Sequence, residues 1–185
     1  MSTIFTIGHS TRALPDFHEM LIAHGVKLVV DVRRYPGSRR YPHFAKEALS
    51  ASLAEHGIGY LHEPDLGGRR RPRADSPHTF WRSASFRAYA DYMETEPFQQ
   101  ALARLIAESQ QRTAAIMCAE AVPWRCHRQL IADSLVAHGH DVLDILSATR
   151  ADPHQLNPAA QLLPSGQLLY QASADDQGQR LLDLG

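Results

Sequence analysis

The chain has 185 residues, 44% of them hydrophobic and 21% charged, and a formal net charge of -1 at pH 7. These values are typical of a single globular domain with a sizeable core, and they exclude a protein that binds nucleic acid or membranes through its overall charge. Two cysteines are too few for a disulfide scaffold, and no stretch approaches the roughly 18 apolar residues that span a bilayer. The first residues lack the pattern of a signal peptide, so we expect a cytoplasmic protein with free thiols and no membrane partner.

Strands and helices alternate through the first part of the chain. The expected elements, in order, are a strand at 4–7, a helix at 15–24, a strand at 26–32, a helix at 46–56 and a weaker strand at 58–62. Two irregular loops follow the second and third strands, at 35–44 and 63–78, where proline and glycine prevent regular structure. Both loops are rich in arginine, so they form a local anion-facing patch on a chain that is otherwise neutral.

The same alternation continues to about residue 146. The expected elements are helices at 86–94 and 95–110, a strand at 114–117, a helix that Pro123 opens and Gly139 ends, a strand at 141–146 and a short strand at 167–171. This order predicts a single three-layer α/β domain with a mostly parallel central sheet of about five strands and helices on both faces. We expect residues 1–146 to form the core domain. Residues 147–185 would be an extension packed on the core or peripheral to it, and peripheral from Ser173 onward.

Reactive side chains follow four of the predicted strands. Because parallel strands end at the same edge of a sheet, and ligands bind along that edge, these side chains are expected to meet in space. They are His9, Ser10, Asp31, Arg33, His62, Cys118 and Glu120.

Cys118 is the sharpest candidate for chemistry. A thiol just past a buried strand, near a helix N-terminus and cations, has a lowered pKa and acts as a nucleophile. The alternative is an inert core cysteine, since cysteine is among the most buried residue types. Cys118 and Arg125 are seven residues apart, so this is not the Cys-x5-Arg loop of tyrosine phosphatases, and a rhodanese-like or phosphatase mechanism is only an analogy.

Asp31, Glu120 and His9 are the candidate acid–base partners of that thiol. Each has a structural alternative. Asp31 would pair with Arg33, Glu120 would accept hydrogen bonds from loop backbone N–H groups, and His9 would be a satisfied loop histidine.

Arginine forks bind phosphate and carboxylate groups bidentately, and aromatic residues interleaved with them suit nucleotides or single-stranded nucleic acid. The alternative is a pair of solvated, salt-bridged loops. The predicted substrate-binding residues are Ser10, Arg33, Arg34, Arg39, Arg40, Gly67, Gly68, Arg125, His127 and Arg128.

Cys126 is expected in the first turns of the helix after Pro123, packing that helix against the sheet. Together with Cys118 and a histidine it would supply zinc ligands, yet Cys-x7-Cys followed by His is not a usual zinc spacing. We therefore expect neither a metal nor a cofactor at this site.

Five motifs resemble the domain-of-unknown-function family 488. They are TIGHST at 6–11, VDVRRYPGSRR at 30–40, GIGYLHEPDLGG at 57–68, FRAYADYM at 86–93 and MCAEAVPWRCHRQLIAD at 117–133. The resemblance covers about residues 3–146 and implies a compact α/β protein of the bacterial cytoplasm, with no activity to transfer. The family pattern has a histidine in the strand where this chain has Asp144.

The sequence is consistent with three functions. The first is a Cys118-dependent enzyme that acts on a phosphate-bearing small molecule or nucleic acid. The second is a non-catalytic nucleic-acid-binding module that uses the same basic loops. The third is a metal-dependent hydrolase built on the two cysteines and a histidine.

Overall fold

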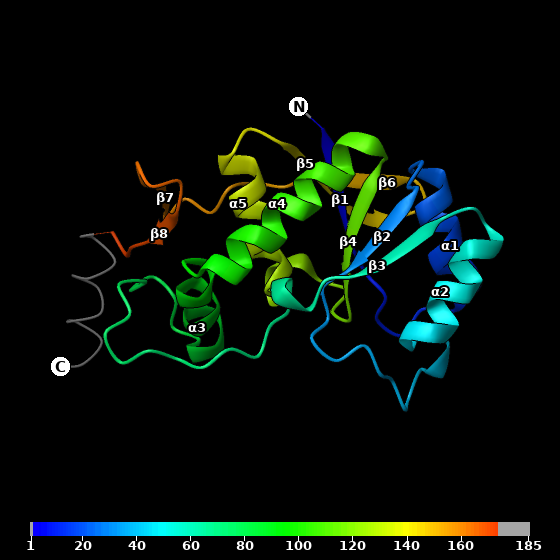
Figure 1. The fold of residues 1–185 in the computed structure, drawn as a ribbon, viewed down its shortest axis with the longest axis horizontal. Helices are drawn as coiled ribbons and strands as arrows, with labels where there is room; N and C mark the ends of the chain where they lie inside the picture. Colours follow the sequence, from blue (N-terminus) through cyan, green and yellow to red (C-terminus); the bar gives the residue numbers. More distant parts are fainter. Residues whose placement is uncertain (1, 174–185) are drawn as a thin grey trace.

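A computed structural model describes residues 2–173 and shows a six-stranded sheet in the order β3-β2-β4-β1-β5-β6 (Figure 1). Strands β1 to β5 run parallel, and β6 is antiparallel to β5. The strands are β1 Thr3–Gly8, β2 Leu28–Asp31, β3 Gly59–His62, β4 Ala114–Cys118, β5 Asp141–Ser147 and β6 Arg150–Pro153. This confirms the predicted mostly parallel sheet. The sixth strand was not predicted, because Arg150–Pro153 is polar and contains a proline, a composition that strands tolerate at a sheet edge.

Helices cover both faces of the sheet, as predicted (Figure 1). They are α1 Leu14–Ala23, α2 Lys46–Glu55, α3 Ala84–Met93, α4 Glu96–Gln111 and α5 Arg128–Ala137. Apolar residues of α1 and α2 pack with one face of the sheet, and those of α3, α4 and α5 pack with the other. Two separate cores result, which is the three-layer α/β arrangement.

Alternation along β4 decides which core each of its side chains enters. All five residues of the strand are buried. Ala115 and Met117 pack on the α1 and α2 side, whereas Ile116 and Cys118 pack on the side of α5. Because successive side chains of a strand point to opposite faces, the apolar run that ends at Cys118 aims its thiol toward the segment just before α5.

The chain reverses its direction of winding at β4. The helix after β1 covers one face of the sheet and the helix after β4 covers the other, although these strands are neighbours. Such a switch point opens a crevice at the carboxyl ends of the strands, and this is where open α/β sheets bind ligands. The register places Gly8 beside Cys118, so the residues that follow β1 and β4 lie on either side of this crevice.

Helix α5 begins later than the sequence predicts. Pro123–Arg125 forms a short 3-10 turn, Cys126 is extended with φ -125° and ψ 148°, and the helix starts at Arg128. The prediction that Cys126 lies in the first turns of this helix is therefore wrong. The extended backbone at Cys126 ends the turn that Pro123 starts and lets the thiol face β4.

Residues after β5 contribute to the main sheet and to a small hairpin. Strand β6 completes the sheet edge, and β7 Ala160–Leu162 pairs with β8 Leu168–Tyr170. The prediction of peripheral residues from Ser173 onward concerns residues 174–185, which lie outside the described residues. Among residues 2–173, none of the helices combines the length and the apolar composition needed to cross a bilayer.

Candidate active site

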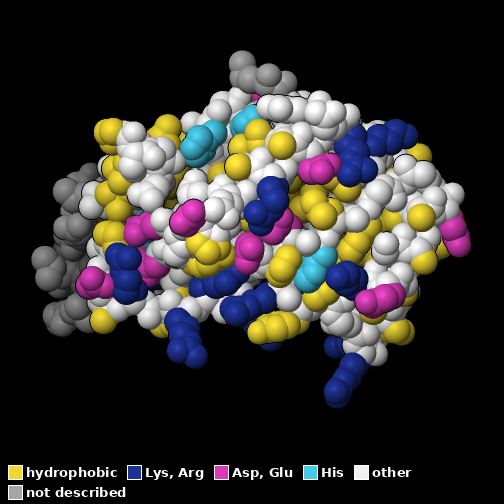
Figure 2. Space-filling model, viewed as in Figure 1, with side chains coloured by type: hydrophobic (Ala, Val, Ile, Leu, Met, Phe, Trp, Pro, Cys, Tyr) yellow, Lys and Arg dark blue, Asp and Glu magenta, His cyan; other side chains and the backbone are white. Residues whose placement is uncertain are grey.

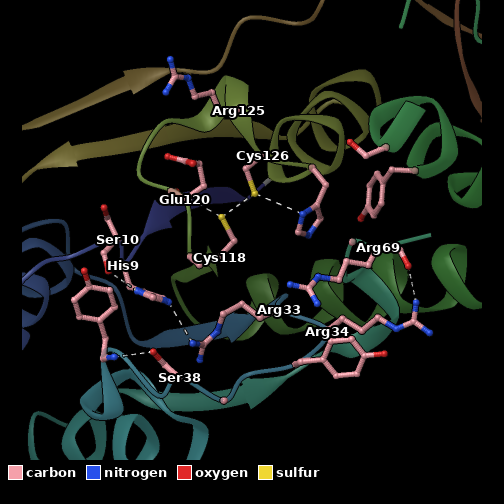
Figure 3. A pocket seen from close by; sticks show the side chains of 18 of the residues that line it. His9, Ser10, Arg33, Arg34, Ser38, Arg69, Cys118, Glu120, Arg125 and Cys126 are labelled. Atoms are coloured by element: carbon pink, nitrogen blue, oxygen red, sulfur yellow. Dashed lines mark hydrogen bonds between the residues drawn. The ribbon is translucent and has the colours of Figure 1, made fainter. Parts of the chain in front are cut away.

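A cavity of about 820 Å³ opens at the carboxyl ends of the parallel strands (Figure 3). Loops after β1, β2, β3 and β4 all contribute to its walls, in agreement with the expectation that separate strand ends meet. Lys and Arg side chains gather below the sheet in the view of Figure 2, around the place where the loops after β2 and β3 leave it. The arginines that line the cavity are Arg33, Arg34, Arg40, Arg69 and Arg125, whereas Glu120 is the one acidic residue among the lining residues.

Most of the predicted site residues line this cavity. They are His9, Ser10, Arg33, Arg34, Arg40, Gly68, Cys118, Glu120, Arg125 and His127. Four predicted residues do not line it, namely Asp31, Arg39, Gly67 and Arg128. His62, also named with the strand ends, lies outside the lining, and its Nε2 bonds the backbone oxygen of Arg33 at 2.8 Å.

The two cysteines form a contacting pair of free thiols. Cys126 Sγ donates to Cys118 Sγ at 2.8 Å, and Arg128 Nη1 donates to the same Cys118 sulfur at 2.9 Å. Arg128 is 1% exposed, and its Nη1 also donates to the backbone oxygen of Glu120 at 3.0 Å. Arg128 therefore lies behind the thiol, where its guanidinium faces the sulfur and the loop rather than the cavity.

These contacts separate the two thiols chemically. Burial alone would raise the pKa of Cys118, but the hydrogen bond from Cys126 and the positive charge of Arg128 outweigh it and lower the pKa to about 7. The pKa of Cys126 is raised well above its usual value by the hydrogen bond to Cys118 and by burial. Cys118 is the thiolate-bearing member of the pair, and Cys126 keeps its proton.

Arg33 is held on the opposite wall by a network of buried groups. Its Nε and Nη2 donate to the two carboxylate oxygens of Asp31 at 2.8 and 2.6 Å, and Tyr60 donates to Asp31 Oδ2 at 2.5 Å. Asp31 is fully buried, so its carboxylate points at Arg33 rather than into the cavity. The Asp–Arg ion pair weighed in the sequence analysis is present. It fixes the guanidinium in a bidentate geometry at the cavity wall.

His9 lies between Arg33 and the loop after β1. Its Nδ1 bonds the backbone oxygen of Ser10 at 2.9 Å, which makes Nδ1 the protonated nitrogen. Nε2 then accepts from Arg33 Nη1 at 3.3 Å, and the ring stacks on Phe44 with centroids 4.4 Å apart. Burial lowers the pKa of His9 to about 4, with a further lowering from Arg33, so the ring is neutral at pH 7.

Glu120 and Arg125 lie in the loop that joins β4 to α5. Glu120 is exposed, and its Oε1 accepts from the backbone N–H of Val122 at 3.2 Å, which is the loop-bracing role considered above. The Arg125 side chain extends away from the two sulfurs in Figure 3. Both residues line the cavity without touching the thiol pair through their side chains.

Glycines let the loops of the site approach each other closely. A Cβ on Gly8 would lie 1.9 Å from the backbone oxygen of Glu120, so only glycine lets β1 lie against the loop after β4. A Cβ on Gly67 would meet Pro64 O at 2.8 Å and the backbone of Arg34 at 2.9 Å. One on Gly68 would lie 3.1 Å from His127 Nδ1. The Gly67–Gly68 pair thus joins the second basic loop to its neighbours.

The two basic loops contact each other at the cavity rim. Arg34 Nη1 donates to the backbone oxygen of Arg69 at 2.8 Å, and the guanidinium groups of both lie over the Tyr35 ring, at 5.7 and 5.8 Å from its centroid. Ser10 and Arg69 have positive φ values of 48° and 60°. Non-glycine residues in this strained region cluster at ligand-binding sites, and both of these line the cavity.

A cluster of possible metal ligands lies outside the cavity. Among residues 2–173, the group of His, Cys, Asp and Glu side chains whose ligand atoms all lie within 4.8 Å of one another is His78, Asp91 and Glu94. The backbone N–H of Tyr170 donates to His78 Nδ1 at 3.2 Å, so Nε2 carries the proton and donates to Glu94 Oε1 at 2.9 Å. An imidazole in this tautomer has no free lone pair for a metal.

Sequence reasoning did not find three features of the site. Tyr89 lines the cavity from α3, with its ring 4.9 Å from that of His127, and no local pattern distinguishes it from a core residue. The thiol–thiol contact of Cys126 depends on the late start of α5. The approach of Arg128 to Cys118 was not foreseen either, because it also depends on where α5 begins.

A family model described as domain of unknown function DUF488 matches residues 13–135. The chain belongs to this family. The match confirms the resemblance inferred from the motifs. It covers β2, β3, β4 and most of α5, and therefore both cysteines, Arg33 and Arg128. Neither the curated proteins nor the solved structures gave a match. The family description carries no activity.

Proposed function

We propose that the protein is a cytoplasmic, cysteine-dependent enzyme that acts on a phosphate-bearing substrate, a nucleotide or nucleic acid, bound at the carboxyl edge of the sheet. One observation carries the proposal. Cys118 Sγ accepts a hydrogen bond from Arg128 Nη1 at 2.9 Å, and Cys118 lines the same cavity as five arginine side chains. A nucleophile and a group of cationic side chains therefore share one cavity, and this arrangement supports attack on a phosphate-bearing substrate.

The electrostatics of the cavity favour an anionic ligand. Five arginines and one glutamate line it, although the whole chain carries a formal net charge of -1. Arg33 is pre-oriented by Asp31 and pays little side-chain entropy on binding an anion. A volume of about 820 Å³ lies within the range of small-molecule sites, about 300–1,000 Å³.

The proposed roles follow from these positions. Cys118 attacks as the thiolate, and Arg128 stabilises that thiolate from behind. Arg33, Arg34 and Arg40 hold the phosphate. Glu120, which is exposed and lines the cavity, is the group placed to exchange protons with substrate or water. His9, whose Nε2 accepts from Arg33, and Asp31 both act by positioning Arg33.

The test is turnover of a panel of nucleoside mono-, di- and triphosphates and single-stranded oligonucleotides by the full chain. Cys118→Ser is expected to abolish any turnover found. Arg40→Ala is expected to weaken substrate binding, while Arg39→Ala, which changes a neighbouring arginine outside the cavity lining, serves as the matched control. Turnover that survives Cys118→Ser contradicts the proposal.

A second candidate, a non-catalytic module for single-stranded nucleic acid, is favoured by one feature. Tyr35 is 64% exposed at the cavity rim, and the guanidinium groups of Arg34 and Arg69 lie 5.7 and 5.8 Å from its ring centroid. Stacking of a base on such an aromatic residue, next to arginines, binds single strands with a steep salt dependence. This candidate predicts oligonucleotide binding that Tyr35→Ala weakens and Cys118→Ser leaves unchanged. Binding that persists without Arg33, Arg34, Arg39 and Arg40 would eliminate it.

A further inference from the structure

The proposed function does not explain why the two thiols are in contact. A single thiolate suffices for nucleophilic attack, yet Cys126 Sγ lies 2.8 Å from Cys118 Sγ, and both cysteines are free. They come from different elements, the end of β4 and the extended residue before α5. The late start of α5 produces this contact, because an earlier helix would carry Cys126 away from β4.

The pair is chemically asymmetric. Cys118 Sγ accepts a hydrogen bond from the guanidinium of Arg128, whose positive charge favours the thiolate. Cys126 lies 3.5 Å from His127 Nδ1 and accepts from the backbone N–H of Arg128, also at 3.5 Å. Burial lowers the pKa of His127 to about 4, so that ring is neutral at pH 7. One sulfur is therefore prepared to react first, and the other holds a proton that it can release later.

Only small molecules can reach the two buried thiols. Cys118 is 2% exposed and Cys126 7% exposed, but both line the 820 Å³ cavity. A small molecule reaches them through the cavity, whereas a cysteine of another folded protein does not. Hydroperoxides and low-molecular-weight thiols meet this requirement.

We propose that Cys118 and Cys126 form a two-cysteine redox site, in which a hydroperoxide oxidises Cys118 and Cys126 resolves the product to an intramolecular disulfide. The proposal rests on the same reactive Cys118 as the proposed function, but it needs no phosphate-bearing substrate. It gives Cys126 a chemical role and makes the disulfide a reversible modification that removes the nucleophile.

The reaction balances in two steps. The Cys118 thiolate attacks one oxygen of hydrogen peroxide, an S–O bond forms and the O–O bond breaks. Hydroxide leaves, and the sulfur is oxidised by two electrons to the sulfenic acid. Cys126 then attacks this sulfur, an S–S bond forms, and the S–O bond breaks. The hydroxyl group of the sulfenic acid takes up the proton of Cys126 and leaves as water. A small dithiol reverses the modification by thiol–disulfide exchange.

The surrounding structure permits this bond. The sulfurs start 2.8 Å apart and have to approach by about 0.8 Å to reach the bonding distance of a disulfide. The loop between them, residues 119–125, carries mostly exposed or half-buried residues, so it can adjust without opening either core. A disulfide at this place leaves Arg128 without its thiolate partner.

The wild-type chain supplies the primary experiment. It is treated with hydrogen peroxide and then denatured in the presence of N-ethylmaleimide, which alkylates any free thiol. Trypsin then cleaves after Arg125 and separates the two cysteines. We expect a chain that has lost two hydrogen atoms and carries no maleimide, with the peptides of Cys118 and Cys126 linked within one molecule. Dithiothreitol should restore both thiols. Two free thiols after treatment, or a disulfide only between molecules, would overturn the proposal.

Single variants separate the two roles. In Cys126→Ser, Cys118 should accumulate as the sulfenic acid, trapped by dimedone, and proceed to the sulfinic acid. In Cys118→Ser, Cys126 should react at least about tenfold more slowly than Cys118 does in Cys126→Ser, because it keeps its proton. Equal rates for the two thiols contradict the assignment. If a variant does not fold, the disulfide mapped in the wild-type chain still decides.

The two proposals fail in distinguishable ways. Disulfide formation without turnover of any phosphate-bearing substrate would retain the redox site and remove the proposed enzyme. Turnover by a chain whose thiols both survive peroxide would do the reverse. Peroxide should also abolish turnover in the wild-type chain, and dithiothreitol should restore it.

Discussion

Two buried polar networks of this protein use histidine in opposite ways. In the cavity, burial and, to a smaller extent, the charge of Arg33 lower the pKa of His9 to about 4. On the other side of β1, His154 is bonded to Asp133 at 2.9 Å and to Asp144 at 3.1 Å. Burial would lower the pKa of His154 too, but these two carboxylates raise it to about 9. Burial lowers the pKa of both rings, but the two carboxylates beside His154 outweigh it, so only that ring carries a proton at pH 7.

The two networks also differ in what they leave available. Asp133 accepts from the Tyr170 hydroxyl at 2.8 Å, and Thr6 donates to Asp144 at 2.5 Å, so the His154 network joins β1, β5, α5 and β8. None of these residues lines the 820 Å³ cavity. The cavity network instead presents a thiol and arginines to a hollow. The first network therefore joins elements of the fold, and the second faces the 820 Å³ cavity.

The largest expected effect comes from breaking the cavity network at Arg128. Arg128→Met removes the donor of three contacts, to Cys118, Glu120 O and Ala121 O, and leaves buried acceptors unpaired. We expect a loss of about 3 kcal/mol in the free energy of unfolding. The pKa of Cys118 should rise from about 7 by at least about one unit, so that the thiolate fraction at pH 7 falls from about a half to about a tenth or less.

Arg125→Met is the matched control for this substitution, because Arg125 lines the cavity without touching the thiol. Chemical denaturation measures the stability, and thiolate absorbance against pH measures the pKa. An unchanged pKa of Cys118 in Arg128→Met would show that Arg128 does not activate it.

The next effect tests the His154 network through pH. The pKa of His154 is raised from 6.5 to about 9, so its contribution to stability is complete below pH 6.5 and is lost as the pH rises through 9. We expect His154→Gln to cost about 2 to 3 kcal/mol at pH 7 and far less at pH 9, measured by urea denaturation at several pH values. The exposed His56→Gln is the control. An equal cost at both pH values would contradict the raised pKa.

His9 should show the opposite sign. Its pKa is lowered from 6.5 to about 4, so the unfolded chain binds a proton first as the pH falls below 6.5, and stability is lost between pH 6.5 and 4. We expect His9→Gln to remove about 2 kcal/mol of the decline between pH 7 and pH 5. A proton NMR titration that places the His9 midpoint near 6.5 would refute this assignment.

The smallest effect concerns the cavity rim. Arg40 lines the cavity and Arg39 does not, although both are exposed. We expect Arg40→Ala to weaken inorganic phosphate binding several-fold, in keeping with an exposed charged contact of about 0.5–1 kcal/mol, and Arg39→Ala to change it little. Isothermal titration calorimetry compares the two. Equal losses would mean that general charge, and not the cavity, attracts the anion.

The sequence predicts much of this architecture, for a physical reason. Buried parallel strands are continuous apolar runs, and topology alone places their ends at one edge, so His9, Arg33 and Cys118 could be assigned to one site. Strand β6 could not be predicted, because Arg150–Pro153 pairs at an edge and carries no apolar signal. The contact of Cys126 with Cys118 depends on backbone angles before α5, which local composition does not specify.

The sequence could not predict the His154 network, because its members are far apart along the chain. His154, Asp133 and Asp144 are separated by 10 to 21 residues, and no spacing rule connects them. The position of Asp144 is explained by the fold, since His154 contacts it from the segment after β6.

The proposed function requires Cys118 to be an activated thiol in a cavity that binds anions. The most direct test is the rate at which iodoacetamide alkylates Cys118 in the folded wild-type chain, followed by mass spectrometry from pH 5 to 10 with and without inorganic phosphate. A midpoint near pH 7, with alkylation slowed by phosphate, is the predicted result. A midpoint at or above the ordinary thiol value of 9.0, or a Cys118 that does not react until the chain unfolds, would show that this thiol is not activated.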